Sequence, residues 1–185
     1  LRAGLYYGRI SGDDSKNSDP ELKQRNLNFK SHIIEFNLGC EYTILDMNSD
    51  EGSFISPYVF AGVGVFHFNP YTKDSRGEKY FLRPLCTEGQ GLAEYPLRKK
   101  YKLTQFEIPI AVGAKIDLGA YIGSLDGWIF SYEFMYHHTF TDYLDDVSLN
   151  YVPLELLTAA YGPKSAELSF RENNNPAFFN RYRKE

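Results

Sequence analysis

Several stretches of this chain alternate apolar and polar residues with a period of two. In residues 34–44 the even positions are apolar, while the odd positions hold Glu, Asn, Gly, Glu and Thr. Residues 106–116 and 128–140 repeat the pattern, and residues 1–8 show it more weakly. Because successive side chains on a strand point to opposite faces, the pattern predicts β-strands with one apolar and one polar face.

The alternating segments and the turn-forming stretches between them divide the chain into strands and connections. The strands are expected at about 1–10, 29–45, 56–69, 101–117 and 127–141. The connections are then 11–28, 46–55, 70–100, 118–126 and 142–185. The segment 57–69 is apolar at odd and even positions alike, so the pattern does not orient it.

Long and short connections alternate along the chain, as they do in outer-membrane β-barrels, where loops outside the cell are long and periplasmic turns short. This predicts that 11–28, 70–100 and the extended loop 142–185 are extracellular, and that 46–55 and 118–126 are periplasmic turns. Within the last loop, residues 153–160 have the composition of a short helix that ends near Gly162-Pro163.

The predicted fold is an all-β, antiparallel transmembrane β-barrel that forms a single domain over residues 1–185. Five strands cannot close such a barrel, because the smallest have about eight. An open sheet edge cannot face lipid, since unpaired backbone groups are costly there. We therefore expect eight strands in the intact protein, with two before Leu1 and one after Glu185.

Two features indicate that the apolar face contacts lipid. The polar faces carry many small residues, whereas a water-facing surface usually carries more charge. Aromatic residues lie near strand ends, as at membrane interfaces: Tyr42, Tyr58, Phe66, Phe68, Phe106, Trp128 and Phe140. The predicted lipid-facing residues are Ile34, Phe36, Leu38, Phe106, Ile108, Ile110, Phe130 and Phe134. A soluble lipocalin-like barrel, with its apolar face inside, is the alternative.

The opposite face would line the barrel interior. Its charged residues are Arg2, Glu35, Glu41, Glu107, Lys115 and Glu133. Isolated charges are costly in such a place, so we expect them to form pairs and hydrogen bonds. Side chains fill the interior of an eight-stranded barrel, which excludes an open pore.

Composition narrows the functional classes. The net charge is −4 and no basic stripe is present, which excludes a nucleic-acid partner. No run of about 18 apolar residues is present, so no transmembrane helix is predicted. Two cysteines in a chain of 185 residues exclude a disulfide scaffold. Cys40 falls on the apolar face of a strand and Cys86 in a connection, and no disulfide between them is expected.

No catalytic, cofactor-binding or metal-binding constellation is evident. His137 and His138 are neighbours on a strand and point to opposite faces, so they cannot share one metal ion. The same holds for a dyad of Ser31 and His32. The segment 87–91 has two glycines without a following Lys-Ser/Thr, so it reads as a turn and not as a P-loop.

An acidic group, Asp142, Asp145 and Asp146, begins the last connection. Calcium binding is one interpretation, but the spacing does not follow an EF-hand, and a solvated acidic loop is the preferred reading.

Five segments resemble a known family in the same order along the chain. They read YGRISG at 7–12, SPYVFAGVGVFHFNP at 56–70, LCTEGQGL at 85–92, LTQFEIP at 103–109 and TFTDYLDDVS at 139–148. These segments resemble the small outer-membrane β-barrels of Bacteroidota that include the PorG component of the type IX secretion system. Cys86 stands where glycine would be more usual in that family.

The resemblance implies a non-enzymatic accessory protein in the outer membrane. Its partners would be outer-membrane lipid and the periplasmic ring proteins and lipoprotein of the PorK and PorN type, which it would tether. The turn residues that would face such partners are Asp46, Asp50, Glu51 and Asp126. The alternatives are an outer-membrane protein that binds an unknown ligand or belongs to another complex, and an outer-membrane enzyme that acts on lipid.

Overall fold

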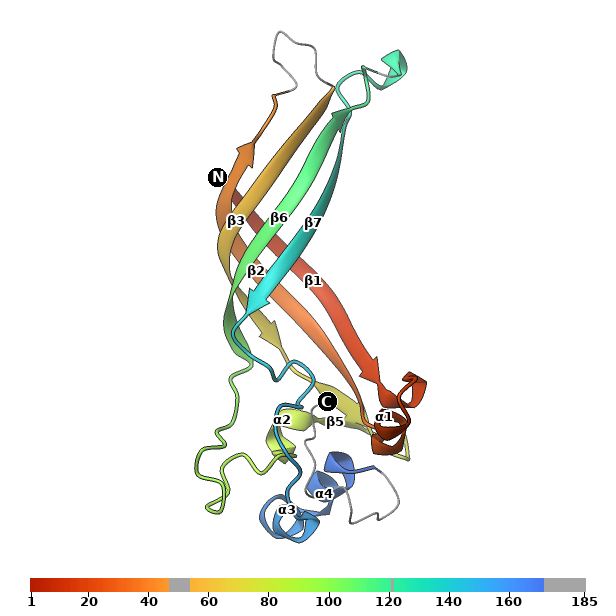
Figure 1. Ribbon diagram of the computed structural model, residues 1–185, viewed down its shortest axis with the longest axis vertical. Helices are drawn as coiled ribbons and strands as arrows, with labels where there is room; N and C mark the ends of the chain where they lie inside the picture. Colours follow the sequence, from red (N-terminus) through yellow and green to blue (C-terminus); the bar gives the residue numbers. More distant parts are fainter. Residues whose placement is uncertain (47–53, 121, 172–185) are drawn as a thin grey trace. The chain divides into compact units, whose positions relative to one another are not determined.

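The computed structural model describes residues 1–46, 54–120 and 122–171. Within these residues the chain is mostly antiparallel β-structure (Figure 1). The long strands are β1 (Arg2–Asp13), β2 (Asn28–Thr43), β3 (Ile55–Phe68), β6 (Thr104–Asp117) and β7 (Ile129–Thr139). Each begins and ends within a few residues of a predicted strand, so the positions of the five predicted strands are confirmed, and the mostly antiparallel β-structure is consistent with the all-β assignment.

The described strands form one seven-stranded sheet. Six of them follow the order β5-β4-β2-β3-β6-β7, and the seventh, β1, also pairs with β2. The short strands β4 (Tyr71–Lys73) and β5 (Lys79–Phe81) were not predicted. Strands β6 and β7 pair in register from Glu107 opposite Thr139 to Asp117 opposite Ile129. The sheet curls like one half of a barrel wall.

Contacts between residues divide the chain into two compact units. The sheet unit comprises Leu1–Tyr6, Glu35–Phe66 and Gln105–Phe140; the loop unit comprises Tyr7–Ile34, His67–Thr104 and Thr141–Glu185. The boundaries fall within or beside the long strands and not at linkers. All three long predicted connections belong to the loop unit and both short ones belong to the sheet unit, so the predicted asymmetry of the connections is present in the structure.

The sheet unit has an inner face with polar groups and an outer face that is apolar. Along β2 the residues Glu35, Asn37 and Gly39 are buried, and the alternate positions are exposed. Strand β3, which the pattern did not orient, turns its even positions inward: Tyr58 and Phe60 are buried while the odd positions are mostly exposed.

This orientation of β3 corrects part of the predicted aromatic belt. Tyr58, Phe66 and Phe68 are 4%, 2% and 0% exposed, so they lie on buried faces and not on the outer surface. The prediction failed there because β3 is apolar at both sets of positions. Four other members of the predicted belt, Tyr42, Phe106, Trp128 and Phe140, are exposed.

The loop unit is more ordered than a set of connections would suggest. It contains a 3₁₀ turn η1 (Asp14–Lys16) and the helices α1 (Pro20–Arg25), α2 (Leu82–Leu85), α3 (Leu154–Tyr161) and α4 (Pro163–Ser169). Helix α3 confirms the predicted helix, but Gly162-Pro163 also begins α4, which was missed. Gly162 has a φ of 88°, which favours glycine, and proline is tolerated in the first turn of a helix.

The loop unit has its own core. Leu92, Val152, Leu157 and Ala166 form a buried apolar cluster against which Tyr95 packs. This cluster joins the connection between β5 and β6 to helices α3 and α4. Residues 142–171 are therefore packed structure and not an extended loop.

No helix within the described residues has both the length and the apolar character that a membrane-crossing helix needs. The two cysteines are free thiols: Cys40 is exposed and Cys86 is buried. Both positions agree with the sequence-based expectation of no disulfide.

One ion pair of the loop unit gives a testable pH effect. Lys164 Nζ donates to Asp74 Oδ2 at 2.7 Å, and Asp74 Oδ1 accepts the backbone N–H groups of Arg76 and Glu78, each at 2.9 Å. The ammonium of Lys164, assisted by those two donors, holds the pKa of Asp74 below its usual range.

Replacing Lys164 with methionine is therefore expected to raise the pKa of Asp74 toward its ordinary value. Because the folded-state pKa is depressed, this carboxylate stabilises the fold above its unfolded pKa, and the contribution is lost as the pH falls through the folded pKa. Titration of the Asp74 carboxyl carbon by NMR measures the shift; an unchanged pKa would contradict the assignment.

Candidate functional site

Four of the predicted interior charges meet in one cluster on the inner face of the sheet unit. Arg2 Nη1 and Nη2 donate to the two oxygens of Glu133 at 2.5 and 3.1 Å, and Nη1 also donates to Glu41 at 3.3 Å. Lys115 Nζ donates to the other oxygen of Glu41 at 2.5 Å. We call these residues, together with Tyr58, the Arg2 cluster. Its two cations and two carboxylates balance, as the pairing expectation required.

The Arg2 cluster joins the five long strands because small residues leave room for its large ones. Tyr58 on β3 reaches across β6 and donates its hydroxyl to Glu133 on β7 at 2.9 Å. A Cβ added at Gly113 of β6 would lie 2.5 Å from the Tyr58 ring, so only glycine lets that ring pass. The guanidinium carbon of Arg2 lies 3.9 Å from the centre of the Phe60 ring, where a cation–π contact adds to the ion pairs.

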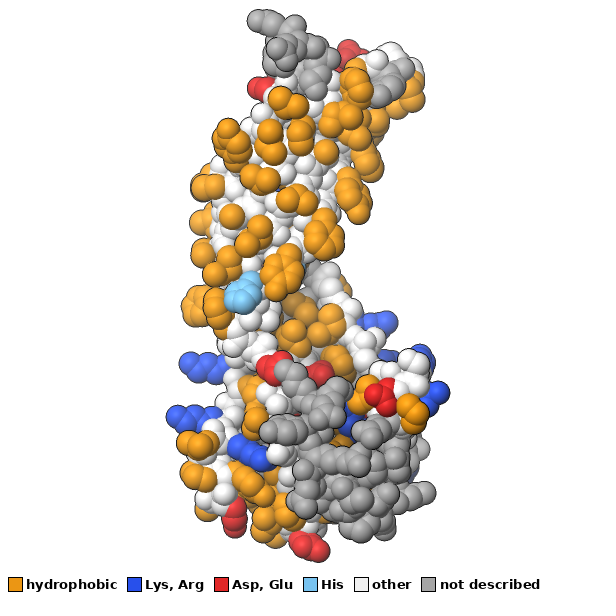
Figure 2. Space-filling view, in the orientation of Figure 1, with side chains coloured by type: hydrophobic (Ala, Val, Ile, Leu, Met, Phe, Trp, Pro, Cys, Tyr) orange, Lys and Arg blue, Asp and Glu red, His pale blue; other side chains and the backbone are white. Residues whose placement is uncertain are grey.

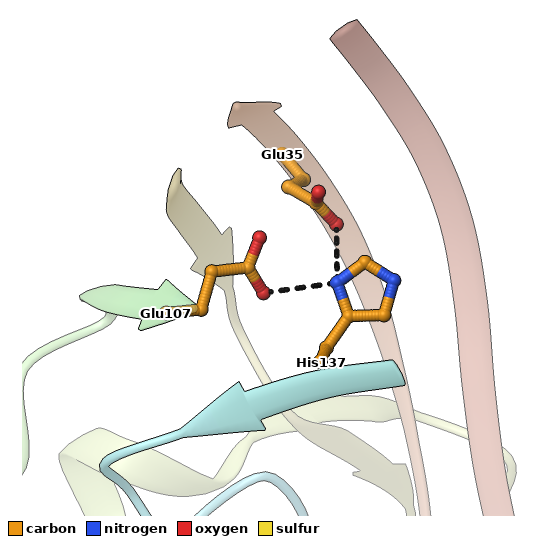
Figure 3. A group of neighbouring side chains, drawn as sticks. All are labelled: Glu35, Glu107 and His137. Atoms are coloured by element: carbon orange, nitrogen blue, oxygen red, sulfur yellow. Dashed lines mark hydrogen bonds and ion pairs between the residues drawn. The ribbon is translucent and has the colours of Figure 1, made fainter. Parts of the chain in front are cut away.

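The remaining two predicted interior charges lie together in a second place. Glu35 on β2 and Glu107 on β6 are 6% and 3% exposed, and both face His137 on β7 (Figure 3). His137 Nδ1 lies 3.3 Å from Glu35 Oε2 and 3.2 Å from Glu107 Oε2. We call these three residues the Glu107 cluster. The sequence predicted both carboxylates on this face but did not predict that His137 joins them.

Glycine again makes the meeting possible. Strand β3 lies between β2 and β6, and a Cβ at its Gly64 would be 2.7 Å from Glu107 Oε1 and 3.2 Å from Asn37 Cβ. Asn37, fully buried, donates its amide to Glu35 Oε1 at 2.6 Å and so holds that carboxylate in place. Neither Asn37 nor Gly64 was singled out from the sequence, although the small residues of 61–64 were a signal of close approach.

The outer face of the sheet carries every residue that was predicted to face lipid. All eight are exposed: Ile34, Phe36, Leu38, Phe106, Ile108, Ile110, Phe130 and Phe134. In Figure 2 hydrophobic side chains cover the strands of the sheet unit on the face in view. Water-soluble monomeric proteins rarely expose so many neighbouring large apolar side chains.

Pairing between β6 and β7 makes the outer face continuous. Ile108, Ile110 and Val112 lie opposite His138, Tyr136 and Phe134, and the next outward pairs are Ala114 with Tyr132 and Ile116 with Phe130. Directly opposite residues of an antiparallel pair have close Cβ atoms, so these side chains pack side by side. His138 takes part in this face through an edge contact with Phe140. His137 and His138 therefore point to opposite faces, as predicted.

The predicted partner contacts belong to the two short turns of the sheet unit. Asp46 and Asp126 are exposed, while Asp50 and Glu51 lie outside the described residues. The two turns lie at the same end of the sheet, because the N–H of Asp117 donates to Phe54 O at 3.0 Å. The second turn contains the 3₁₀ segment η2 (Gly123–Leu125).

The acidic group at the start of the last connection is not one site. Asp146 is fully buried: Thr87 Oγ1 and Tyr101 OH donate to its two oxygens at 2.5 and 2.6 Å. Asp145 accepts the N–H of Val147, and Asp142 accepts the Ser148 hydroxyl. The reading of a solvated acidic loop is wrong for Asp146, which is a structural residue.

Residues 87–90 of the segment 87–91 are likewise buried. Glu88 Oε1 accepts the backbone N–H groups of residues 148 and 149 at 2.9 and 2.8 Å, so this side chain ties two long connections together. Sequence reasoning treated the segment as a plain turn. Its run of polar residues beside glycines gave no sign of burial, because the partners are about sixty positions away.

Comparison with known proteins adds one finding. Residues 1–83 match the family model of a domain of unknown function, DUF6089. No curated protein and no solved structure matches the chain.

Proposed function

We propose that this chain is part of a non-enzymatic outer-membrane β-barrel, and that the apolar outer face of its sheet contacts lipid. The observation that carries the proposal is the separation of side chains in the sheet unit. Charged groups gather on the inner face, where Arg2 and Lys115 pair with Glu41 and Glu133, while large apolar side chains are exposed on the outer face. In water this arrangement would be inverted, because burial of apolar surface drives folding.

The length of the apolar strand segments supports the same proposal. On β6 the outward positions from Phe106 to Ile116 are all apolar, and they span eleven residues of strand. A tilted transmembrane strand needs about 9–11 residues to cross the hydrocarbon layer.

Membrane fractionation with heat-dependent gel migration tests the proposal. We expect the intact protein in the outer-membrane fraction, extracted by detergent and not by alkaline carbonate. Unheated samples should migrate differently from boiled ones, as folded barrels do because they resist detergent unfolding. A protein that stays monomeric in buffer without detergent would overturn the proposal.

The more specific role rests on the family resemblance. We propose an accessory role in type IX secretion, in which the barrel tethers a periplasmic ring of the PorK and PorN type to the outer membrane. The exposed carboxylates of Asp46 and Asp126 in the two short turns suit a basic partner surface, since rim charges steer association.

Charge reversal tests this role. Replacing Asp46 and Asp126 with lysine should lower recovery of ring proteins in detergent pull-downs several-fold, while the barrel itself still assembles. The matched control is Glu155→Lys, a reversal at an exposed position of α3 in the loop unit. Equal recovery from all variants, or recovery of surface partners alone, would reject the tethering role.

A second candidate is an outer-membrane binding protein, or a subunit of another complex, that uses its loop unit. The observation that favours it is the order of that unit: it has a buried apolar cluster and buried hydrogen bonds between distant connections. Loops that a rigid scaffold positions commonly carry binding residues. Retained partner binding after replacement of both short turns would favour this candidate.

A further inference from the structure

The two charged clusters of the inner face differ in their charge balance. The Arg2 cluster contains two cations and two carboxylates that neutralise one another. The Glu107 cluster contains two carboxylates and one imidazole, and no Lys or Arg of the described residues forms an ion pair with Glu35 or Glu107. Even a protonated His137 would leave one negative charge uncompensated. Buried carboxylates at such close range are stabilised by a further positive charge, which either a shared proton or a bound cation can supply.

The atoms of the Glu107 cluster converge on one point. One ligand atom from each of Glu35, Glu107 and His137 lies within 4.8 Å of the others. The two carboxylate oxygens are 3.3 and 3.2 Å from His137 Nδ1. Bonds of about 2.0–2.2 Å from zinc to nitrogen and oxygen imply ligand–ligand distances of roughly 3.3–3.5 Å in a tetrahedral site. The two nitrogen–oxygen separations therefore match those of ligands around a small cation.

The surroundings of the cluster are built to hold these oxygens together. Glu107 Oε1 is buried and has no hydrogen-bond partner among the described residues. Gly64 leaves the space that this oxygen occupies, and Asn37 fixes Glu35 through its other oxygen. A buried carboxylate oxygen without a donor, beside a second carboxylate and an imidazole, is an arrangement that a cation stabilises.

We propose that Glu35, Glu107 and His137 bind a divalent transition-metal cation, for which Zn²⁺ is the best-fitting ion. A mixed set of one imidazole and two carboxylates suits zinc better than calcium or magnesium, which prefer oxygen ligands alone. Two carboxylates and a neutral imidazole match a dication in charge. The ion would join β2, β6 and β7 across β3, so its role is to hold the sheet together. This proposal does not depend on the secretion role.

The test uses the intact protein, purified folded and stripped of metal with a chelator, and titrated with Co²⁺ and then Zn²⁺. We expect one Co²⁺ per chain with the visible absorption bands of a low-coordinate site, and loss of those bands when one equivalent of Zn²⁺ is added. X-ray absorption of the Zn²⁺ form should show a single imidazole among nitrogen and oxygen ligands.

Variants locate the site. Asn37→Ala should weaken Zn²⁺ binding by about tenfold, because Asn37 only positions the ligand Glu35, and loss of such a supporting residue typically costs roughly 10–100-fold. Glu107→Gln should weaken Zn²⁺ binding by more than roughly 100-fold, because it removes a ligand itself. The matched control is Glu41→Gln in the Arg2 cluster, which should bind with unchanged affinity.

Two outcomes overturn the proposal. One is the absence of saturable binding by the folded wild-type protein, in which case protons shared between the carboxylates neutralise the cluster. The other is binding that persists unchanged in Glu107→Gln, which would locate the ion elsewhere. If a variant does not fold, the Co²⁺ and X-ray absorption spectra of the wild-type protein decide the question alone.

Discussion

Replacing Val112 with arginine is expected to prevent or strongly impair assembly of the protein in lipid. Val112 lies near the middle of β6 on the outer face, and its side chain is 56% exposed opposite Phe134. A cation at the midplane of a membrane barrel costs about 2–4 kcal/mol, because it loses its hydration. The measurement is the free energy of folding into lipid vesicles, obtained by denaturant titration.

The matched control for this variant is Leu97→Arg. Leu97 is also an exposed apolar residue, at 93%, but it belongs to the loop unit. We expect this variant to fold within about 0.5 kcal/mol of the wild type, as surface substitutions usually do. If both arginine variants were equally well tolerated, the outer face would be in water and the membrane account would fail.

Replacing Glu133 with alanine is expected to destabilise the fold by about 1–3 kcal/mol, because the partly buried Arg2 guanidinium and the Tyr58 hydroxyl lose their acceptor. Glu133 accepts two hydrogen bonds from Arg2 and one from the Tyr58 hydroxyl, and all three donors lie on the inner face. The loss should appear as a lower midpoint of chemical unfolding for the intact protein in detergent or vesicles.

A pair from the loop unit provides the comparison. Lys164 Nζ also reaches Glu167 at 2.7 Å, where the glutamate side chain is 44% exposed. Glu167→Ala should cost less than about 1 kcal/mol, because exposed ion pairs contribute little. Equal effects from Glu133→Ala and Glu167→Ala would show that the Arg2 cluster is solvated in the intact protein and does not support the sheet.

The alternation of apolar and polar residues predicted the strands and their faces, because the direction of each side chain on a strand follows from its odd or even position in the local sequence. Residues 34–44 and 106–116 therefore gave both the strand and the side that faces out. The pattern failed at β3, where one face carries valine and alanine and the other carries glycine and aromatic residues, so that neither face is charged. The inward direction of Tyr58 and Phe60 follows from the pairing of β3 with β2 and β6. The sequence of β3 alone does not specify that pairing.

The candidate site was predicted only in its composition. The sequence assigned Glu35 and Glu107 to the polar face, and it indicated that charged residues on that face would form pairs. Which residues pair depends on strand order and register: His137 meets Glu35, about a hundred positions away in the chain, because β2 and β7 are both neighbours of the β3–β6 pair. The roles of Gly64 and Asn37 beside these carboxylates can be recognised only once the strand order is known.

The loop unit escaped prediction for a different reason. Its stabilising contacts join residues far apart in sequence, such as Tyr101 with Asp146 and Lys164 with Asp74. Polar and glycine-rich segments have no periodic pattern from which such contacts could be predicted. Only α3, with its helix-forming residues before Gly162-Pro163, carried a local signal.

The most direct test of the account asks what touches the outer face of β2. Cys40 is an exposed free thiol on that face, whereas Cys86 is buried, so a nitroxide label can be attached at Cys40 in the intact protein reconstituted in vesicles. The account predicts that dissolved oxygen, which concentrates in hydrocarbon, relaxes the label more than a water-soluble nickel chelate does. A label at Leu97→Cys, in a Cys40→Ala background, should show the reverse. A Cys40 label that the nickel chelate reaches more readily than oxygen would contradict the central claim that this face lies in lipid.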